Sequence, residues 1–291
     1  MRKKQIIFNI DKLKICYRQN TETFNYFKDL KAPQFINRDD YTLHLLQVDD
    51  LSAEVNVIVG NEVLGMFTFH NSKRYEGLCF FTFDNKALYS FLTYDFGNKT
   101  KCNLIPLITF IADDLNLEFN NITTLEVAMD CNFNISAKLR KLIKDYENYD
   151  MFVNGKKVKD PNRVLPLYHE TFKRNRKRLI YTPTLYFEQA KTDAPLMRIY
   201  NKTDEINDTS NGKNYINDWN DFGNIDTYRV EVRLKSNSIK EYLKRLDTDR
   251  HPLDLLQDPN ALFSIWNYFG SRLVYFRHID GTDLTITDLC E

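Results

Sequence analysis

The strongest constraint on the fold is an alternation of polar and apolar residues in three distant segments, Thr123–Asp130, Leu196–Lys202 and Tyr228–Lys235. Successive side chains of a β-strand point to opposite sides, so this period of two predicts strands with one apolar and one polar face. In the third segment the apolar positions are Tyr228, Val230, Val232 and Leu234. Its polar positions are Arg229, Glu231, Arg233 and Lys235.

The polar faces of the other two predicted strands carry different groups. Glu126 and Asp130 share a face of the first strand, and Arg198, Tyr200 and Lys202 share a face of the second. An antiparallel sheet with one solvated side gives the same alternation, and in that case the polar residues need not converge. If the strands are neighbours, however, their polar faces bring acids, arginines, a lysine and a phenol onto one surface.

Such a surface suits phosphoryl chemistry. A phosphodiester resists nucleophiles because its oxygens are anionic, so a divalent metal or an arginine must neutralise the charge of the transition state. Carboxylates such as Asp130 and Glu231, with Glu126 on the same polar surface, are suitable ligands for Mg²⁺ or Mn²⁺. A phenol has a pKa of about 10, so Tyr200 needs a neighbouring cation, and Arg198 and Lys202 are placed to provide it.

The rest of the chain predicts an α+β fold, mainly an antiparallel sheet with covering helices. Residues 1–90 are rich in aromatic and β-branched residues separated by turn signals, which predicts an antiparallel meander. The predicted helices are Ile105–Leu117, Ser136–Tyr146 with a capping serine, Ser238–Leu246 and Ala261–Phe269. Asn154 and Gly155 predict a tight turn, and residues from about Asp204 to Asp226 predict a polar loop.

Composition limits the class of protein. Lys and Arg together number 40, as do Asp and Glu, so any contact with nucleic acid must come from a local cluster and not from bulk charge. The five cysteines are scattered without a CxxC pair, which argues against a disulfide framework and a thiolate zinc site. The longest apolar stretch, Leu104–Ala112, is far below the roughly 18 residues that span a bilayer. We therefore expect a soluble cytoplasmic protein without a membrane partner.

The strongest local basic cluster lies in the segment Phe172–Arg178. Its cationic residues are Lys173, Arg174, Arg176, Lys177 and Arg178. They could neutralise several DNA phosphates, or they could form a solvated surface loop. The sequence has neither a GxxxxGK[ST] loop nor a GxGxxG fingerprint, so DNA unwinding would need a separate helicase.

Three motifs in order, Leu125–Asp130, Pro195–Lys202 and Tyr228–Lys235, resemble the replication initiation factors of rolling-circle plasmids and filamentous phages, the Rep_trans type. The resemblance spans roughly residues 122–240. It implies a nuclease fold similar to the HUH endonucleases and an origin-specific, metal-dependent nickase. Such an enzyme forms a 5′-phosphotyrosyl link and leaves a free 3′-hydroxyl for a host polymerase. The chain has no His-x-His, in agreement with a metal centre made of carboxylates.

The resemblance also implies roles for individual residues. It gives Asp130 and Glu231 as metal ligands and Tyr200 as the nucleophile. The implied phosphate contacts are Arg198, Lys202, Arg229 and Arg233. Family members often carry a Tyr-Phe-Gly-Ser stretch upstream, whereas this chain has Leu185–Gln189 without the Gly-Ser, so Tyr186 remains a competing nucleophile.

These observations predict a nicking and origin-binding domain over residues 1–245, with the motif-bearing core at about 122–240, and a helical C-terminal extension over residues 246–291. The expected partners are origin DNA, single-stranded or cruciform, and a host helicase and polymerase, and a homodimer stays open. Two alternatives remain: a non-catalytic origin-binding replication protein, and a mobilisation relaxase with the same chemistry.

Overall fold

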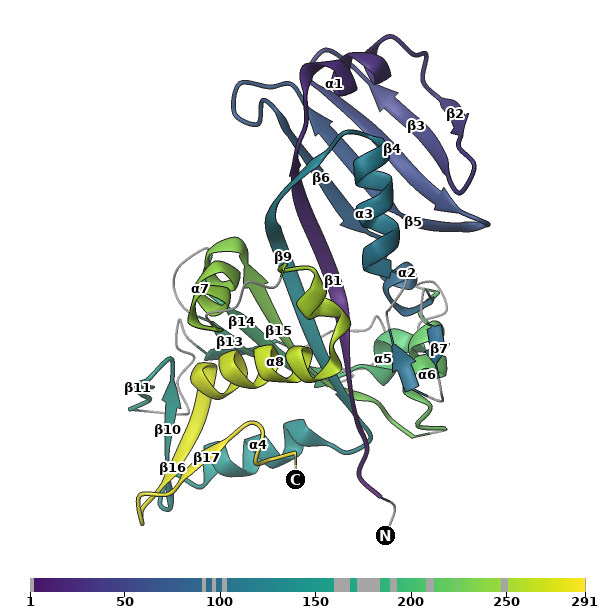
Figure 1. Cartoon of the computed structure of the whole chain (residues 1–291). Coiled ribbons are helices and arrows are strands. Elements are labelled where there is room, and N and C mark those ends of the chain that lie inside the picture. Colours follow the sequence, from purple (N-terminus) through teal and green to yellow (C-terminus); the bar gives the residue numbers. More distant parts are fainter. Residues whose placement is uncertain are drawn as a thin grey trace. The chain divides into compact units, whose positions relative to one another are not determined.

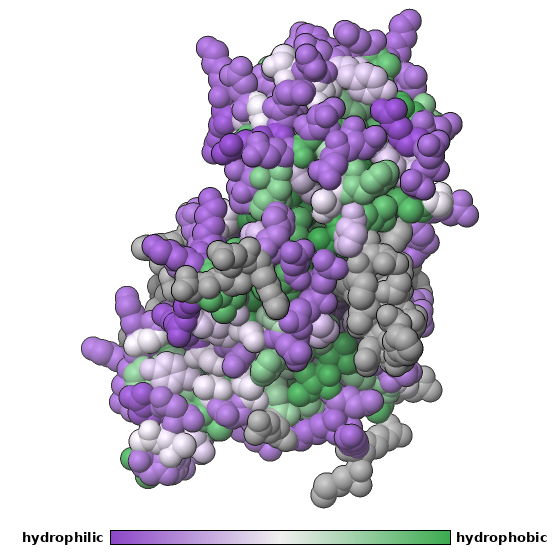
Figure 2. All heavy atoms as spheres, in the orientation of Figure 1, coloured by the Kyte–Doolittle hydropathy of each residue, from purple (hydrophilic) through white to green (hydrophobic). Residues whose placement is uncertain are grey.

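The computed structural model describes residues 3–90, 93–95, 98–100, 104–159, 168–171, 184–188, 193–207, 212–223, 225–246 and 251–290 (Figure 1). The chain forms two compact units. The first consists of Met1–Ile10, Glu126–Asp247 and Pro259–Glu291, and the second of Asp11–Leu125 and Thr248–Asp258. On the face shown in Figure 2, the surface of each unit is mostly hydrophilic. The predicted division near residue 245 stays a prediction.

The second unit is built on an antiparallel sheet. Its strands are β1 (Ile6–Arg18), which begins in the first unit, β2 (Gln34–Asn37), β3 (Thr42–Val48), β4 (Ser52–Val59), β5 (Glu62–His70) and β6 (Leu78–Phe83). The strand order is β1-β6-β5-β4-β3-β2, and every one of these pairs is antiparallel. The meander predicted for residues 1–90 is therefore confirmed.

Alternate residues of this sheet form the core of the second unit. Fully buried members include Leu43, Leu45, Val55, Val57, Phe67, Phe69 and Phe81. Helix α1 (Thr21–Lys28) packs against β3 and β4, and α3 (Leu104–Asp114) buries its apolar face, as predicted for this segment. The remaining elements are α2 (Asn85–Ser90), the short pair β7 (Thr93–Asp95) and β8 (Asn98–Thr100), and the 3-10 helix η2 (Asp254–Gln257).

The first unit contains the three strands with polar faces. Its main sheet comprises β9 (Glu118–Cys131), which begins in the second unit, β12 (Tyr168–Thr171), β13 (Thr184–Glu188), β14 (Leu196–Asn201) and β15 (Tyr228–Lys235). The order is β12-β13-β14-β15-β9-β1, so the three segments are neighbours. Arg198 lies opposite Glu231 and Tyr200 opposite Arg229, which puts these four side chains on one face. The predicted fold class, α+β with a mainly antiparallel sheet and helices, is confirmed.

A smaller sheet completes the first unit. Its strands are β11 (Lys156–Lys157), β10 (Tyr149–Val153), β16 (Val274–His278) and β17 (Asp283–Thr285), in that order. Asn154 and Gly155, with φ of 51° and 73°, form the predicted tight turn between β10 and β11. The C-terminal segment thus adds two strands to the predicted helix, α8 (Pro259–Leu273). Trp266 of α8 donates a hydrogen bond from Nε1 to the Val230 carbonyl at 3.2 Å, which fixes the helix against the apolar side of β15.

Two local predictions are wrong. The region predicted to be a polar loop contains α5 (Thr203–Ile206) and α6 (Tyr215–Asn220), which are too short to show an apolar period. Helix α4 (Ile135–Lys144) is capped by Asn134, whose Oδ1 accepts from the Ala137 N–H at 2.9 Å, and not by Ser136. The helix predicted for Ser238–Leu246 is confirmed as α7 (Ser236–Leu246). None of the helices in the part of the chain that the structure describes has the length and apolar character to cross a bilayer.

The capping assignment gives a testable prediction. Asn134→Ala removes the side-chain acceptor of the first turn of α4, and we expect it to lower the free energy of unfolding by about 1 kcal/mol. Ser136→Ala is the matched control, because the buried Ser136 Oγ has no hydrogen-bond partner among the described residues. Chemical denaturation of both variants checks this. A larger loss in Ser136→Ala than in Asn134→Ala would show that the cap is assigned to the wrong residue.

Candidate active site

The polar face of β9, β14 and β15 is buried. Five of its charged residues are 0–3% exposed, from Arg229 at 0% to Glu126 at 3%, with Glu231, Asp130 and Lys202 between them. The side chains of Arg198 and Arg233 on the same face are half-buried. A solvated sheet face, the simpler interpretation of the alternation, is therefore excluded for these residues. Burying a charge is costly unless it is paired, so the pairing of these groups defines the site.

Asp130 and Arg229 form a bidentate ion pair at one end of this face. The Arg229 guanidinium donates from Nε to Asp130 Oδ1 at 2.6 Å and from Nη2 to Oδ2 at 2.7 Å. Asn220 of α6 donates from Nδ2 to the same Oδ2 at 3.0 Å. Both carboxylate oxygens are thus engaged by protein donors. The predicted roles of Asp130 as metal ligand and Arg229 as phosphate contact stay predictions.

A second cluster joins two carboxylates and two guanidinium groups. Arg198 Nη2 lies 3.3 Å from Glu126 Oε2 and also donates to Glu231 Oε1, and Arg233 Nε donates to Glu126 Oε1. Carboxylate oxygens of Glu126 and Glu231 lie within 4.8 Å of one another. Burial alone lowers the pKa of Arg198, but the charge of Glu231 raises it above its ordinary value, so the guanidinium stays charged.

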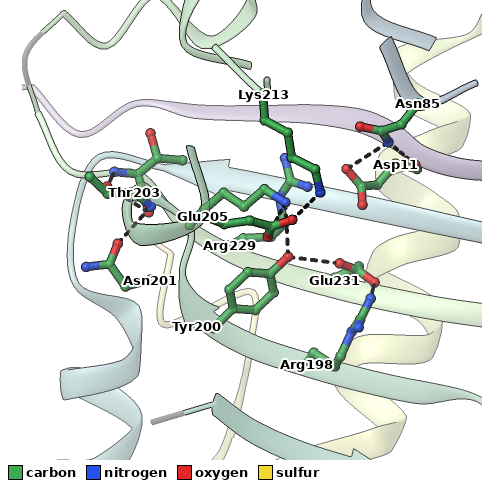
Figure 3. Close-up of polar contacts among 12 residues, drawn as sticks. Asp11, Asn85, Arg198, Tyr200, Asn201, Thr203, Glu205, Lys213, Arg229 and Glu231 are labelled. Atoms are coloured by element: carbon green, nitrogen blue, oxygen red, sulfur yellow. Dashed lines mark hydrogen bonds and ion pairs between the residues drawn. The ribbon is translucent and has the colours of Figure 1, made fainter. Parts of the chain in front are cut away.

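The Tyr200 hydroxyl lies between an acid and a cation (Figure 3). It donates to Glu231 Oε2 at 3.2 Å and accepts from the Lys202 ammonium at 3.5 Å. Because Tyr200 is on β14 and Lys202 directly follows that strand, their spacing is set by the backbone. Glu231 is a hydrogen-bond acceptor for the phenolic proton, and Lys202 is a positive charge beside the oxygen.

Lys202 is held by residues that the sequence analysis missed. Glu205 of α5 accepts from Lys202 Nζ through Oε2 at 2.6 Å, and Lys213 contacts its other oxygen, Oε1. Burial alone raises the pKa of Glu205, but the charges of Lys202 and Lys213 lower it overall below its ordinary value of 4.5. The only sequence signal for this contact was the spacing of three residues between Lys202 and Glu205.

Tyr186, the competing nucleophile, lies on the same polar face. Tyr186 on β13 lies opposite Arg198, which in turn lies opposite Glu231, so the three residues point to one face of the sheet. The two tyrosines are therefore both on the polar face. The cationic residues of the basic run, Lys173, Arg174, Arg176, Lys177 and Arg178, lie outside the described residues.

Comparison with known proteins gives few matches. No family model matches the chain, and no curated protein matches it either. Among solved structures, the chain is similar to the structure of a rolling circle replication initiator protein from Geobacillus stearothermophilus, with a TM-score of 0.44 and 15% identity over 84% of this chain and 80% of that chain. Similarity at this level carries no inference about the activity of this chain.

The Asp130–Arg229 pair gives a prediction about stability. Arg229→Met leaves a buried carboxylate without its guanidinium, and we expect a loss of about 3–5 kcal/mol in the free energy of unfolding. Asp130→Leu should cost a similar amount. The double variant should recover most of the loss, because it removes both buried charges together. Chemical denaturation of all three variants measures this cycle, and additive losses would contradict a coupled pair.

The Glu205 cluster gives a prediction about pH. Because the pKa of Glu205 is lowered in the folded chain, its ionised form stabilises the fold above pH 4.5, and this contribution is lost as the pH falls through the lowered value. Glu205→Gln should therefore be less stable than the wild type at neutral pH, and the difference should vanish in acid. Thermal unfolding across this pH range checks the trend, which an unchanged difference in acid would contradict.

Proposed function

We propose that this chain is a rolling-circle replication initiator that nicks one DNA strand with Tyr200 as the nucleophile. The observation that carries this proposal is the Tyr200 hydroxyl, hydrogen-bonded to the buried Glu231 at 3.2 Å and 3.5 Å from the buried Lys202 ammonium. A phenol needs an acceptor for its proton and a positive charge beside its oxygen to react near neutral pH. Both groups are within reach of the same atom.

The proposed reaction is a transesterification. The Tyr200 proton passes to Glu231 Oε2, and the Lys202 ammonium stabilises the phenolate. The phenolate oxygen forms a bond to phosphorus, and the bond from phosphorus to the 3′ oxygen of the preceding nucleotide breaks. That oxygen takes a proton from solvent, which gives a 5′-phosphotyrosyl link and a free 3′-hydroxyl. The energy of the phosphodiester is retained, so attack by a 3′-hydroxyl can rejoin the strand.

Arg198 and Arg233 are the proposed contacts to the scissile phosphate. Their side chains are 26% and 33% exposed, whereas the side chain of Arg229 is fully buried and paired with Asp130. A guanidinium presents several donors in a plane and can bind two phosphate oxygens at once. Arg198 is therefore suited to hold the phosphate beside Tyr200, its neighbour two positions along β14.

Glu126 and Glu231, with Asp130, are the proposed ligands of a hard divalent cation. Their carboxylates are buried, and oxygens of Glu126 and Glu231 lie within 4.8 Å of each other. Oxygen donors of this kind are preferred by Mg²⁺ and Mn²⁺. The oxygens of all three carboxylates accept hydrogen bonds from protein donors, which a cation would displace in part. A metal ion held here would neutralise the charge that develops on the phosphate oxygens.

The proposal also includes the partners that act after the nick. The free 3′-hydroxyl serves as a primer for a host polymerase, and a separate helicase opens the duplex. The proposal also retains an HUH-like nuclease fold of the Rep_trans type, a nicking domain over residues 1–245 and a cytoplasmic location.

A second candidate function is a non-catalytic origin-binding protein. It is favoured by the position of Arg198, which contacts both Glu126 and Glu231 and so neutralises the carboxylates that would otherwise attract a metal. In this case the polar face is a structural ion-pair network, and DNA binding occurs without cleavage.

A covalent-adduct assay tests the nickase. Purified protein is incubated with Mn²⁺ and a pool of single-stranded oligonucleotides of random sequence labelled at the 3′ end, because the 3′ fragment becomes attached to the tyrosine. We expect a labelled protein band that resists denaturation, depends on the metal and disappears in Tyr200→Phe. Glu231→Gln should slow its formation by roughly 10²–10⁴-fold, the usual contribution of a general base.

Two further variants make the assay specific. Tyr146→Phe is the matched control, because Tyr146 is 62% exposed and lies outside the polar face, so its adduct should be unchanged. If Tyr186→Phe abolishes the band and Tyr200→Phe does not, the nucleophile is Tyr186. Oligonucleotide binding without an adduct under any divalent metal would favour the non-catalytic protein.

A further inference from the structure

A cavity of about 340 Å³ lies in the first unit where α7, α8 and the segment before β14 meet. Its volume is within the range of roughly 300–1,000 Å³ that is typical of small-ligand sites. It has no part in the reaction described above. The residues that matter for its chemistry are Pro195, Glu241, Tyr268, Phe269, Arg272 and Leu273.

The cavity combines buried apolar side chains with a charged rim. Phe269 and Leu273 are 7% and 2% exposed and offer an apolar surface. The exposed side chains of Glu241 on α7, Arg272 on α8 and Asp193 before β14 give the rim two acids and one base. Such a cavity suits a ligand with a flat apolar body and a polar edge, and it does not suit a simple anion.

Tyr268 and two arginines form a stack beside the cavity. The guanidinium carbons of Arg245 and Arg272 each lie 5.0 Å from the centre of the Tyr268 ring, and Arg272 Nη1 donates to the Tyr268 hydroxyl at 2.9 Å. The Arg272 guanidinium is thereby held in place by the ring. Unstacked nucleobases bind on aromatic rings and on the planes of arginine side chains, so a base in the cavity would extend this stack.

Glu241 selects among the bases. An ionised carboxylate only accepts hydrogen bonds, so it favours a base edge with adjacent donors. Guanine presents a ring N–H next to an amino group and can bind a carboxylate through both, whereas thymine offers one N–H. Of the four bases, guanine therefore fits Glu241 best.

We propose that this cavity holds a single unstacked guanine of a DNA strand, with Arg272 against the base and Glu241 on its hydrogen-bonding edge. The assignment of the ligand to DNA rests on the proposed function. Pro195 lines the cavity and lies five residues before Tyr200 along the chain, which is roughly 17 Å in an extended strand. The guanine therefore belongs a few nucleotides from the scissile phosphate, where it sets the register of the nick.

Binding of defined oligonucleotides to the full chain tests this proposal. The probes are a fluorescent oligothymidylate, the same strand with one guanine, and the same strand with hypoxanthine, which lacks the amino group, in place of guanine. We expect the guanine strand to bind roughly 10- to 100-fold more tightly than plain oligothymidylate by fluorescence anisotropy, with hypoxanthine between them. Glu241→Gln should lose this preference and keep the affinity for oligothymidylate.

Controls separate the outcomes. Glu147→Gln makes the same charge change at an exposed residue outside the cavity and should keep the preference. Free deoxyguanosine monophosphate is added as a competitor and titrated directly. If it binds as tightly as the guanine strand, and Glu241→Gln weakens it, the source of the base is a free nucleotide and the site stands.

The proposal is overturned if the wild type shows no preference for guanine, or if Glu241→Gln keeps it at full strength. Should no oligonucleotide bind at all, the titration with the nucleotide decides, and failure of that titration also overturns the site. The covalent-adduct assay reports separately on the nickase. A guanine preference without an adduct would therefore refute the proposed function and leave this cavity assigned.

Discussion

The first unit depends on the pairing of charges that have been taken out of water. An isolated buried ion costs several kcal/mol, so Arg229 and Asp130 are stable in the interior only as a bidentate pair. That requirement fixes β15 beside β9, because one partner lies on each strand. It also fixes α6, which supplies Asn220 to the same carboxylate. The arrangement of the polar face follows from these contacts.

The polar face has a closed end and an accessible end. At the closed end, Arg229 and Asp130 are buried and are joined by two hydrogen bonds. At the accessible end, Arg198 and Arg233 keep about a quarter to a third of their side-chain surface exposed, and Arg198 lies two positions from Tyr200 on β14. In the proposed function, a phosphate approaches these half-exposed guanidinium groups. The difference in burial, more than the residue types, distinguishes the candidate reaction centre from the structural pair.

Much of this arrangement could be predicted from the sequence, because the alternation in strands such as Tyr228–Lys235 depends only on the geometry of a strand. The same rule puts the side chains of Glu126, Arg198, Tyr200 and Glu231 on the polar face of the sheet. Which charges pair could not be predicted, because it depends on strand register and on burial. Helices α5 and α6, which carry Glu205 and Asn220, were missed because they are short and bury only one and three side chains, which leaves no periodic pattern.

The first unit is discontinuous in the sequence, and this has a consequence for its synthesis. Strand β10 pairs with β16, and α8 packs on β15, so the stretch Pro259–Glu291 completes a layer begun much earlier in the chain. A ribosome releases the strands of the candidate site before it has made the helix that covers their apolar side. This side of the sheet therefore stays uncovered until Pro259–Leu273 has been synthesised. A chain cut before Pro259 would carry every motif and lack this covering helix.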